Sequence, residues 1–219
     1  MLPIAESLQA VPLFSALSPQ ETAALADGAV VRTFPKSTIV VTEGERSDSL
    51  YVILSGRVKV FVSDEHGKDM VLNVRGPGEY FGELALDEGL RSASVATLEP
   101  SKMAVIANDA LRGFLARHPE AAVQLIRGLI GRIRRTTESL KDLALLDVYG
   151  RVAKLLLELA READGRLVID ERLTQQDIAD RVSASREMVS RILKDLTTGG
   201  YIVNEGGKIV IQRRPPRAW

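Results

Sequence analysis

The chain has 219 residues, 45% of them hydrophobic and 26% charged, which fits one large domain or two small ones. It contains no cysteine, and this excludes disulfides, thiolate metal sites, iron–sulfur clusters and cysteine nucleophiles. With only His66 and His118, a histidine-based metal or haem site is poorly supplied, so no metal is expected. No apolar run is long enough for a bilayer, and the first residues lack a signal peptide's basic start and apolar core, so we expect a cytoplasmic protein.

The charges are unevenly distributed along the chain, although 29 Lys and Arg balance 29 Asp and Glu overall. Residues 1–126 contain 11 basic and 16 acidic residues, and residues 127–219 contain 18 basic and 13 acidic residues. An acidic half joined to a basic half favours contact between the C-terminal half and nucleic acid. Imbalances of this size also arise by chance.

The region up to about residue 108 is predicted to consist mainly of short strands. A helix from Ser18 through Ala26 precedes them, with Ser18 as the N-cap and Pro19 at the first helical position. Regular short strands separated by glycine turns fit a small antiparallel roll or barrel. The predicted strands include Thr38–Val41, Leu50–Leu54, Val58–Val62 and Met70–Val74, and the turns are Glu43-Gly44, Ser55-Gly56, His66-Gly67 and Gly76-Pro77-Gly78.

A long helix is predicted from Pro119 to Leu146. It has an apolar seam of alternating three- and four-residue spacing, the pattern of a helix that pairs with a second copy of itself. The seam consists of Ile126, Leu129, Ile133, Thr136, Leu140 and Leu143. Packing on the helix's own domain is the alternative, but the heavily charged remaining faces favour a dimer.

The C-terminal region is predicted to contain a helix at Val148–Ala160 capped by Asp147, a turn at Asp164-Gly165, two short helices and a hairpin. The two short helices lie within Thr174–Leu196. Thr174 caps the first, with Asp177 three residues on; Ser183-Ala184 forms the turn, and Ser185 caps the second. Seven side chains face inward: Ile178, Ala179, Val182, Val189, Ile192, Leu193 and Leu196.

The second of these helices leaves one polar face outward: Arg186, Glu187, Ser190, Arg191 and Lys194. Arg can donate two hydrogen bonds to guanine, and Glu can accept one from cytosine, while Lys and Ser can hold phosphates. The alternative is a helical hairpin with a solvated charged face. The hairpin that follows turns at Glu205-Gly206-Gly207 and is predicted to form a wing in which Lys208 touches phosphate, and the tail RRPPRAW is expected to be loose.

A second motif, YFGELALDEGLRSASV from Tyr80 to Val95, has the properties of a phosphate site. Gly82 permits close backbone approach, and FGELAL can form one helical turn whose amides face an anion. Arg91 offers a fork of donors suited to a phosphodiester, Ser92 adds a hydroxyl, and Glu83 suits a ribose hydroxyl. A surface turn with a solvated arginine is the alternative.

The stretch LTQQDIADRVSASREMVSRIL closely resembles the winged helix-turn-helix of the cyclic-AMP receptor protein (catabolite activator) and fumarate-nitrate regulator family. The resemblance implies an α+β protein: an N-terminal cyclic-nucleotide-binding β-roll (double-stranded β-helix, jelly-roll-like; residues 1–118), a dimerisation helix (119–146) and a winged helix-turn-helix (147–219). It places Arg186, Glu187 and Arg191 at the three base-reading positions, on a palindrome with TGTGA-like half-sites. Ser183 departs from the glycine that is usual in the turn. The implied DNA-contacting set is Thr174, Gln176, Ser185, Arg186, Glu187, Ser190, Arg191 and Lys208.

The Tyr80–Val95 segment resembles the phosphate-binding cassette of the same family. That resemblance implies that Glu83 binds the 2′-hydroxyl of cyclic AMP, that Arg91 and Ser92 bind the cyclic phosphate, and that Thr136 and Thr137 contact adenine, one of them across the dimer. Arg132 falls on a further basic position near the phosphate. The implied nucleotide-binding set is Gly82, Glu83, Leu84, Arg91, Ser92, Arg132, Thr136 and Thr137.

These features predict a homodimeric, non-enzymatic regulator that binds double-stranded DNA and contacts RNA polymerase, with a hinge near Asp147–Gly150 passing the ligand signal to the reading helices. Several alternatives stay open: cyclic GMP as the ligand, activation without a ligand, and repression rather than activation. A redox- or carbon-monoxide-sensing relative is disfavoured by the missing cysteines and the scarce histidines. A cyclic-nucleotide hydrolase is disfavoured because no nucleophile–base set is recognised in the sequence.

Overall fold

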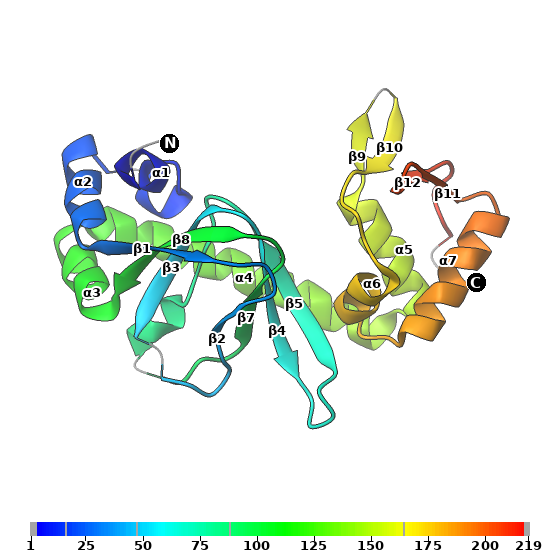
Figure 1. Ribbon diagram of the computed structural model, residues 1–219, viewed down its shortest axis with the longest axis horizontal. Helices are drawn as coiled ribbons and strands as arrows, with labels where there is room; N and C mark the ends of the chain where they lie inside the picture. Colours follow the sequence, from blue (N-terminus) through cyan, green and yellow to red (C-terminus); the bar gives the residue numbers. More distant parts are fainter. Residues whose placement is uncertain (1–3, 16, 47, 88, 164, 217–219) are drawn as a thin grey trace. The chain divides into compact units, whose positions relative to one another are not determined.

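The computed structural model describes residues 4–15, 17–46, 48–87, 89–163 and 165–216 (Figure 1). The chain divides into two compact units, Met1–Ile133 and Arg134–Trp219, and each is described by itself. Among the described residues, no helix combines the length and apolar character needed to cross a membrane.

The first unit is built around two four-stranded antiparallel sheets, which agrees with the small antiparallel roll that the strand pattern predicted. One sheet has the order β1-β8-β3-β6 and the other has the order β2-β7-β4-β5. The first sheet consists of β1 (Ala29–Phe34), β8 (Ser101–Ala107), β3 (Ser49–Ser55) and β6 (Tyr80–Phe81). The second consists of β2 (Ile39–Val41), β7 (Ser94–Thr97), β4 (Val58–Ser63) and β5 (Asp69–Arg75). The four predicted strands correspond to β2, β3, β4 and β5, and each predicted turn contains a glycine with positive φ.

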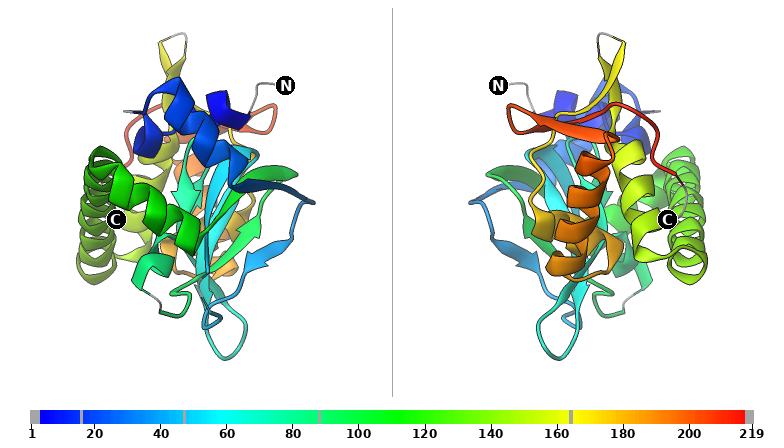
Figure 2. Two further views of the ribbon diagram at one scale, coloured as in Figure 1. Left: turned by 90° about the vertical axis from the view of Figure 1, so that its left-hand side faces the viewer. Right: turned by 90° about the vertical axis from the view of Figure 1, so that its right-hand side faces the viewer.

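Helices cover one side of the first sheet and close its core (Figure 2, left). They are α1 (Ile4–Gln9), the 3-10 turn η1 (Pro12–Phe14), α2 (Pro19–Asp27) and α3 (Asn108–Arg117). The predicted cap of α2 is confirmed, because Ser18 and Glu21 form a reciprocal capping box. The core beneath these helices includes the fully buried Phe14, Leu50 and Leu111.

Helix α4 (Pro119–Leu145) matches the predicted long helix. In the part of α4 that belongs to the first unit, the apolar side chains lie on two faces of the helix. Leu129 packs on the unit's own core, so it does not share the open face that the predicted seam assigned to it. A contiguous stripe is left exposed on α4: Val123 (46%), Ile126 (54%), Ile130 (45%) and Ile133 (66%).

The second unit combines three helices with a four-stranded sheet of order β11-β12-β10-β9. Its elements are α5 (Val148–Leu159), β9 (Arg161–Ala163), β10 (Arg166–Ile169), α6 (Gln175–Val182), α7 (Arg186–Thr198), β11 (Ile202–Glu205) and β12 (Lys208–Ile211). The path from α6 and α7 to the β11–β12 hairpin can be followed in the right-hand view of Figure 2. The short strands β9 and β10 were not predicted; Gly165 of the predicted turn between them is described, and Asp164 lies outside the described residues.

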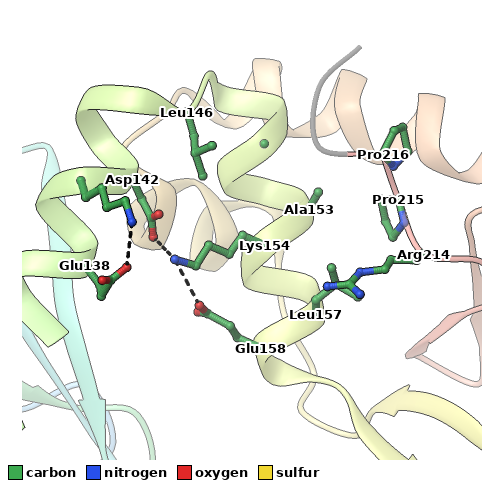
Figure 3. A pocket seen from close by; sticks show the side chains of 12 residues that line it. Glu138, Asp142, Leu146, Ala153, Lys154, Leu157, Glu158, Arg214, Pro215 and Pro216 are labelled. Atoms are coloured by element: carbon green, nitrogen blue, oxygen red, sulfur yellow. Dashed lines mark hydrogen bonds and ion pairs between the residues drawn. The ribbon is translucent and has the colours of Figure 1, made fainter.

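The C-terminal segment is ordered against the second unit, so the expectation of a loose tail is wrong for Arg213–Pro216. The guanidinium of Arg213 lies 4.7 Å from the centre of the Tyr201 ring, and its Nη2 donates to the Gly199 carbonyl. Pro215 is buried, and it lines a pocket of about 500 Å³ with Leu157 of α5 (Figure 3). Residues 217–219 of the predicted tail lie outside the described residues.

Candidate nucleotide pocket and DNA-reading face

The predicted phosphate cassette folds as the strand β6, the 3-10 turn η2 (Glu83–Asp87) and a return into β7. Gly82 occupies the bend with φ of +86°. A Cβ atom there would lie 2.5 Å from the Ser49 carbonyl oxygen and 2.6 Å from Arg91 Nη1, so no larger residue fits without displacing the arginine. Glycine is therefore required at this position for both its backbone conformation and its lack of volume.

Arg91 is held in a fixed orientation inside the pocket wall. It is only 7% exposed, and both Nη atoms donate to the Ser49 carbonyl, at 3.1 and 3.2 Å. Its nearest carboxylate is that of the exposed Asp48, 3.6 Å away. An exposed carboxylate is screened by water, so Arg91 keeps much of its positive field for an anion in the pocket.

Glu83 is the buried carboxylate of the same pocket, 9% exposed. Its Oε1 forms an ion pair with Arg132 of α4, whose Nη2 also donates to the Tyr80 carbonyl at 2.8 Å. Its Oε2 is buried without a hydrogen-bond partner among the described residues. A buried acceptor of this kind is costly unless something donates to it, so Glu83 is suited to receive a ligand hydroxyl.

Arg75 is a pocket residue that the sequence did not reveal. It ends β5 directly before the Gly76-Pro77-Gly78 turn, where an arginine is ordinarily expected to reach into solvent. Instead it is 8% exposed, lines the pocket and donates from Nη1 to the Tyr80 carbonyl. Burial and the neighbouring charge of Arg132 lower the pKa of the Arg75 guanidinium.

The pocket has a volume of about 90 Å³. Its lining consists of Val41, Val60, Arg75, Phe81, Gly82, Glu83, Leu84, Arg91, Ser92, Ala93 and Val95. It brings together five of the predicted nucleotide-binding residues, with Ser92 and Leu84 on the exposed side, and Arg132 joins them through its pair with Glu83. Arg132 therefore contacts the predicted ribose residue, whereas the sequence placed it near the phosphate. Thr136 and Thr137 are exposed residues of α4 within the second unit, and their adenine contacts stay predictions.

A separate group of possible metal ligands lies outside this pocket. His118 Nδ1 is 3.1 Å from Glu21 Oε1 and 3.4 Å from Glu120 Oε1. Glu21 already accepts the Ser18 amide hydrogen bond of the α2 capping box, which also lowers the pKa of its carboxyl. These contacts tie the start of α2 to the α3–α4 junction and account for the cluster without an ion.

The second unit forms the predicted helix-turn-helix. Thr174 and Asp177 complete a capping box at the start of α6, and the Ser185 hydroxyl accepts the Met188 amide at the start of α7. The inward residues Ile178, Ala179 and Val189 are fully buried, as predicted. Ser183 has the left-handed conformation, with φ of +52°, that the turn demands. It therefore carries the strain that a glycine avoids.

The polar face of α7 is open to solvent. Arg186, Glu187, Arg191 and Lys194 are exposed, and Ser190 is partly exposed. Because the helix is already capped and anchored by its apolar face, these side chains can enter a major groove without rearrangement of the backbone.

The remaining predicted DNA contacts are exposed but already paired. The Gln176 amide donates to Asp180 at 2.6 Å, and Lys208 Nζ of the β11–β12 hairpin donates to Asp170 at 2.6 Å. The Lys208 hydrogen bond lowers the pKa of the Asp170 carboxyl. Surface pairs of this kind are weak, so a phosphate can replace the carboxylate as the partner of Lys208.

A small pocket with buried charged side chains in a β-roll and a capped helix-turn-helix with an exposed polar face are the features of a ligand-binding transcription regulator. Residues 31–118 match the model of the cyclic nucleotide-binding domain, and residues 150–215 match that of the Crp-like helix-turn-helix domain. The chain belongs to the cyclic-AMP receptor protein family of bacterial transcription regulators, whose members are not enzymes.

Individual relatives cover nearly the whole chain. The CRP-like cAMP-activated global transcriptional regulator of Mycobacterium tuberculosis is 39% identical over 94% of each chain. The cAMP-activated global transcriptional regulator CRP of Escherichia coli is 35% identical over 83% of this chain and 89% of its own. Among solved structures, the c-di-GMP responsive regulator CLP of Xanthomonas campestris has a TM-score of 0.78 at 25% identity, over 89% of this chain and 99% of its own.

Proposed function

We propose that this protein is a homodimeric transcription regulator that binds a TGTGA-like palindrome in response to cyclic AMP. The observation that carries the ligand assignment is the pairing, in one pocket, of a buried arginine and a buried carboxylate with an unpartnered oxygen. Arg91, with Ser92, is suited to the cyclic phosphate, and Glu83 Oε2 is suited to the ribose 2′-hydroxyl. Relatives named as cAMP-activated support cyclic AMP over other nucleotides.

Arg132 supplies the connection between the ligand and the long helix. It lies on α4 and pairs with Oε1 of Glu83, the carboxylate whose other oxygen is offered to the incoming hydroxyl, so the ligand and the dimerisation helix share one carboxylate. The ligand shifts the protein only to the extent that it binds the DNA-competent state better than the other. Thr136 and Thr137 complete this proposal as adenine contacts on the same helix, with DNA and RNA polymerase as the macromolecular partners.

The ligand assignment is tested by isothermal titration with cyclic AMP and cyclic GMP at equal concentrations. We expect saturable binding of cyclic AMP at one nucleotide per chain and weaker binding of cyclic GMP. Stronger binding of cyclic GMP would reassign the ligand. Binding of neither would favour the alternative function, a ligand-independent activator with an unused pocket.

The homodimer is tested on the exposed stripe of α4. In a dimer that pairs through this stripe, Ile133→Glu places two like charges at an apolar contact and should convert the protein to a monomer in sedimentation velocity. Leu72→Glu is the matched control, since Leu72 is an exposed apolar residue of β5. An unchanged dimer in Ile133→Glu would show that α4 does not form the interface.

A further inference from the structure

The nucleotide pocket contains two buried polar atoms that complement each other and have no hydrogen-bond partner among the described residues. One is an acceptor, Glu83 Oε2, and the other is a donor, Arg75 Nε. Both side chains are more than nine-tenths buried and both line the same pocket. Buried polar groups in folded proteins are almost always satisfied, so this pair points to a partner that the chain itself does not provide.

Each of the two side chains is held by a contact within the protein and has one buried polar atom without a partner among the described residues. The Tyr80 carbonyl accepts from Arg75 Nη1 and from Arg132 Nη2, and Arg132 holds Glu83 by its Oε1. The rest of the Arg75 fork and the second oxygen of Glu83 are therefore held in place for a ligand. A guanidinium stays protonated even when it is buried, so Arg75 presents a permanent donor.

The contacts of Arg75 place it beside Glu83. It shares the Tyr80 carbonyl with Arg132, which in turn pairs with Glu83. Arg91, the predicted phosphate residue, is held instead by the Ser49 carbonyl and Asp48. Arg75 thus belongs with Glu83 rather than with the phosphate-binding arginine.

We propose that Arg75 and Glu83 together bind the 2′-hydroxyl of the cyclic nucleotide. A hydroxyl has one proton to donate and two lone pairs that accept, so it can donate to Glu83 Oε2 and accept from Arg75 Nε at the same time. This inference rests on the proposed function, which already assigns Glu83 to this hydroxyl, and adds Arg75 as a second residue there. A ligand without the hydroxyl leaves both buried atoms unpartnered, so Arg75 should strengthen the selection for a ribonucleotide.

The test is a cycle of two proteins and two ligands. Isothermal titration is run on the wild type and on Arg75→Met, each with cyclic AMP and with 2′-deoxy cyclic AMP. We expect Arg75→Met to weaken cyclic AMP binding by about tenfold, the value of a hydrogen bond to a charged donor, and to weaken 2′-deoxy cyclic AMP binding by about twofold or less. Equal losses for the two nucleotides, or no loss for cyclic AMP, would overturn the role of Arg75.

Two further variants keep the result interpretable. Arg57→Met makes the same change at a half-exposed arginine of the same unit that does not line the pocket, and it should alter neither affinity. Arg75→Lys keeps the charge and a donor for the Tyr80 carbonyl, so it tests the inference if Arg75→Met fails to fold. It should still bind cyclic AMP, but with a smaller preference for cyclic AMP over 2′-deoxy cyclic AMP than the wild type has. A wild type that binds neither nucleotide overturns the ligand assignment itself, and this inference with it.

Discussion

The charged residues of the nucleotide pocket are buried, whereas those of the DNA-reading face are exposed. In the pocket Arg75, Glu83 and Arg91 are nearly inaccessible and already hold partners within the protein. On α7 Arg186 and Arg191 are exposed. The side chains of the first site are fixed by tertiary contacts, and those of the second extend into solvent from a helix that is capped locally and anchored by its opposite, apolar face.

This difference in burial suits the pocket to sensing a ligand and the exposed face of α7 to reading DNA. A ligand that enters the pocket bonds to side chains that also hold contacts within the fold, so binding there can change the state of the protein. DNA that meets α7 replaces water and counterions, so the same face can read a site in whichever state positions it correctly. Variants in the two regions should therefore have separable effects.

The largest effect is expected from removal of the guanidinium that we assign to the cyclic phosphate. Arg91→Ala should weaken cyclic AMP binding by about 100-fold, near 3 kcal/mol, because it deletes a buried charged donor pair. Isothermal titration measures the loss, with Arg57→Ala as the control on the same unit. DNA affinity in the absence of ligand should not change, and a change there would break the separation of the two sites.

The reading helix should give the next largest effect. Arg186→Ala should lower affinity for the TGTGA-like duplex by about 10- to 100-fold (1–3 kcal/mol), relax sequence preference and leave cyclic AMP affinity unchanged. Fluorescence anisotropy on specific and scrambled duplexes distinguishes the loss of affinity from the loss of sequence preference. An equal loss on both duplexes for Arg186→Ala would remove Arg186 from the base-reading set.

In contrast, Lys208→Ala should weaken binding to both duplexes alike and reduce the slope of log affinity against log salt by about one.

Helix capping allows a matched comparison of the two units. Ser18→Ala and Thr174→Ala each delete the hydroxyl of a capping box and should each cost about 1 kcal/mol of unfolding free energy. Amide hydrogen exchange should locate the loss in α2 for Ser18→Ala and in α6 for Thr174→Ala. Only the second variant should weaken DNA binding, and a loss of DNA affinity in Ser18→Ala would contradict the comparison.

The smallest effect is a gain in stability at the turn. Ser183→Gly should stabilise the protein by about 0.5–1 kcal/mol, since it relieves a left-handed serine at some cost in chain entropy. It also removes a buried Oγ that has no hydrogen-bond partner among the described residues. Ser183→Ala keeps the strained backbone and is the control for the hydroxyl alone. Thermal unfolding measures both, and a destabilised Ser183→Gly would show that the serine is not strained.

The sequence predicted local features well. The caps at Ser18, Thr174 and Ser185 and the glycine turns depend on residues a few positions apart, so their pattern is readable along the chain. The cassette was also readable, because its main residues lie within one segment of sixteen. Strand β9 was missed because its three residues, Arg161–Ala163, are all exposed and show no apolar alternation, and β10 was missed together with this partner.

Features set by distant contacts could not be read in this way. The burial of Arg75 depends on the carbonyl of Tyr80 and on a helix more than fifty residues further along the chain. Leu129 and Ile130 are adjacent apolar residues, and only the packing of α4 decides that Leu129 faces the core. Pro215 is buried and lines a pocket with residues of α5, which the basic, proline-rich sequence of the tail does not predict.

The most direct test of the account is fluorescence anisotropy on a labelled duplex carrying TGTGA-N6-TCACA, titrated with the full-length protein with and without cyclic AMP. We predict tight binding that appears only when cyclic AMP is present. Equally tight binding in both conditions would keep the DNA function and contradict the sensing role of the pocket. No specific binding in either condition would contradict the assignment of Arg186, Glu187 and Arg191 to this half-site.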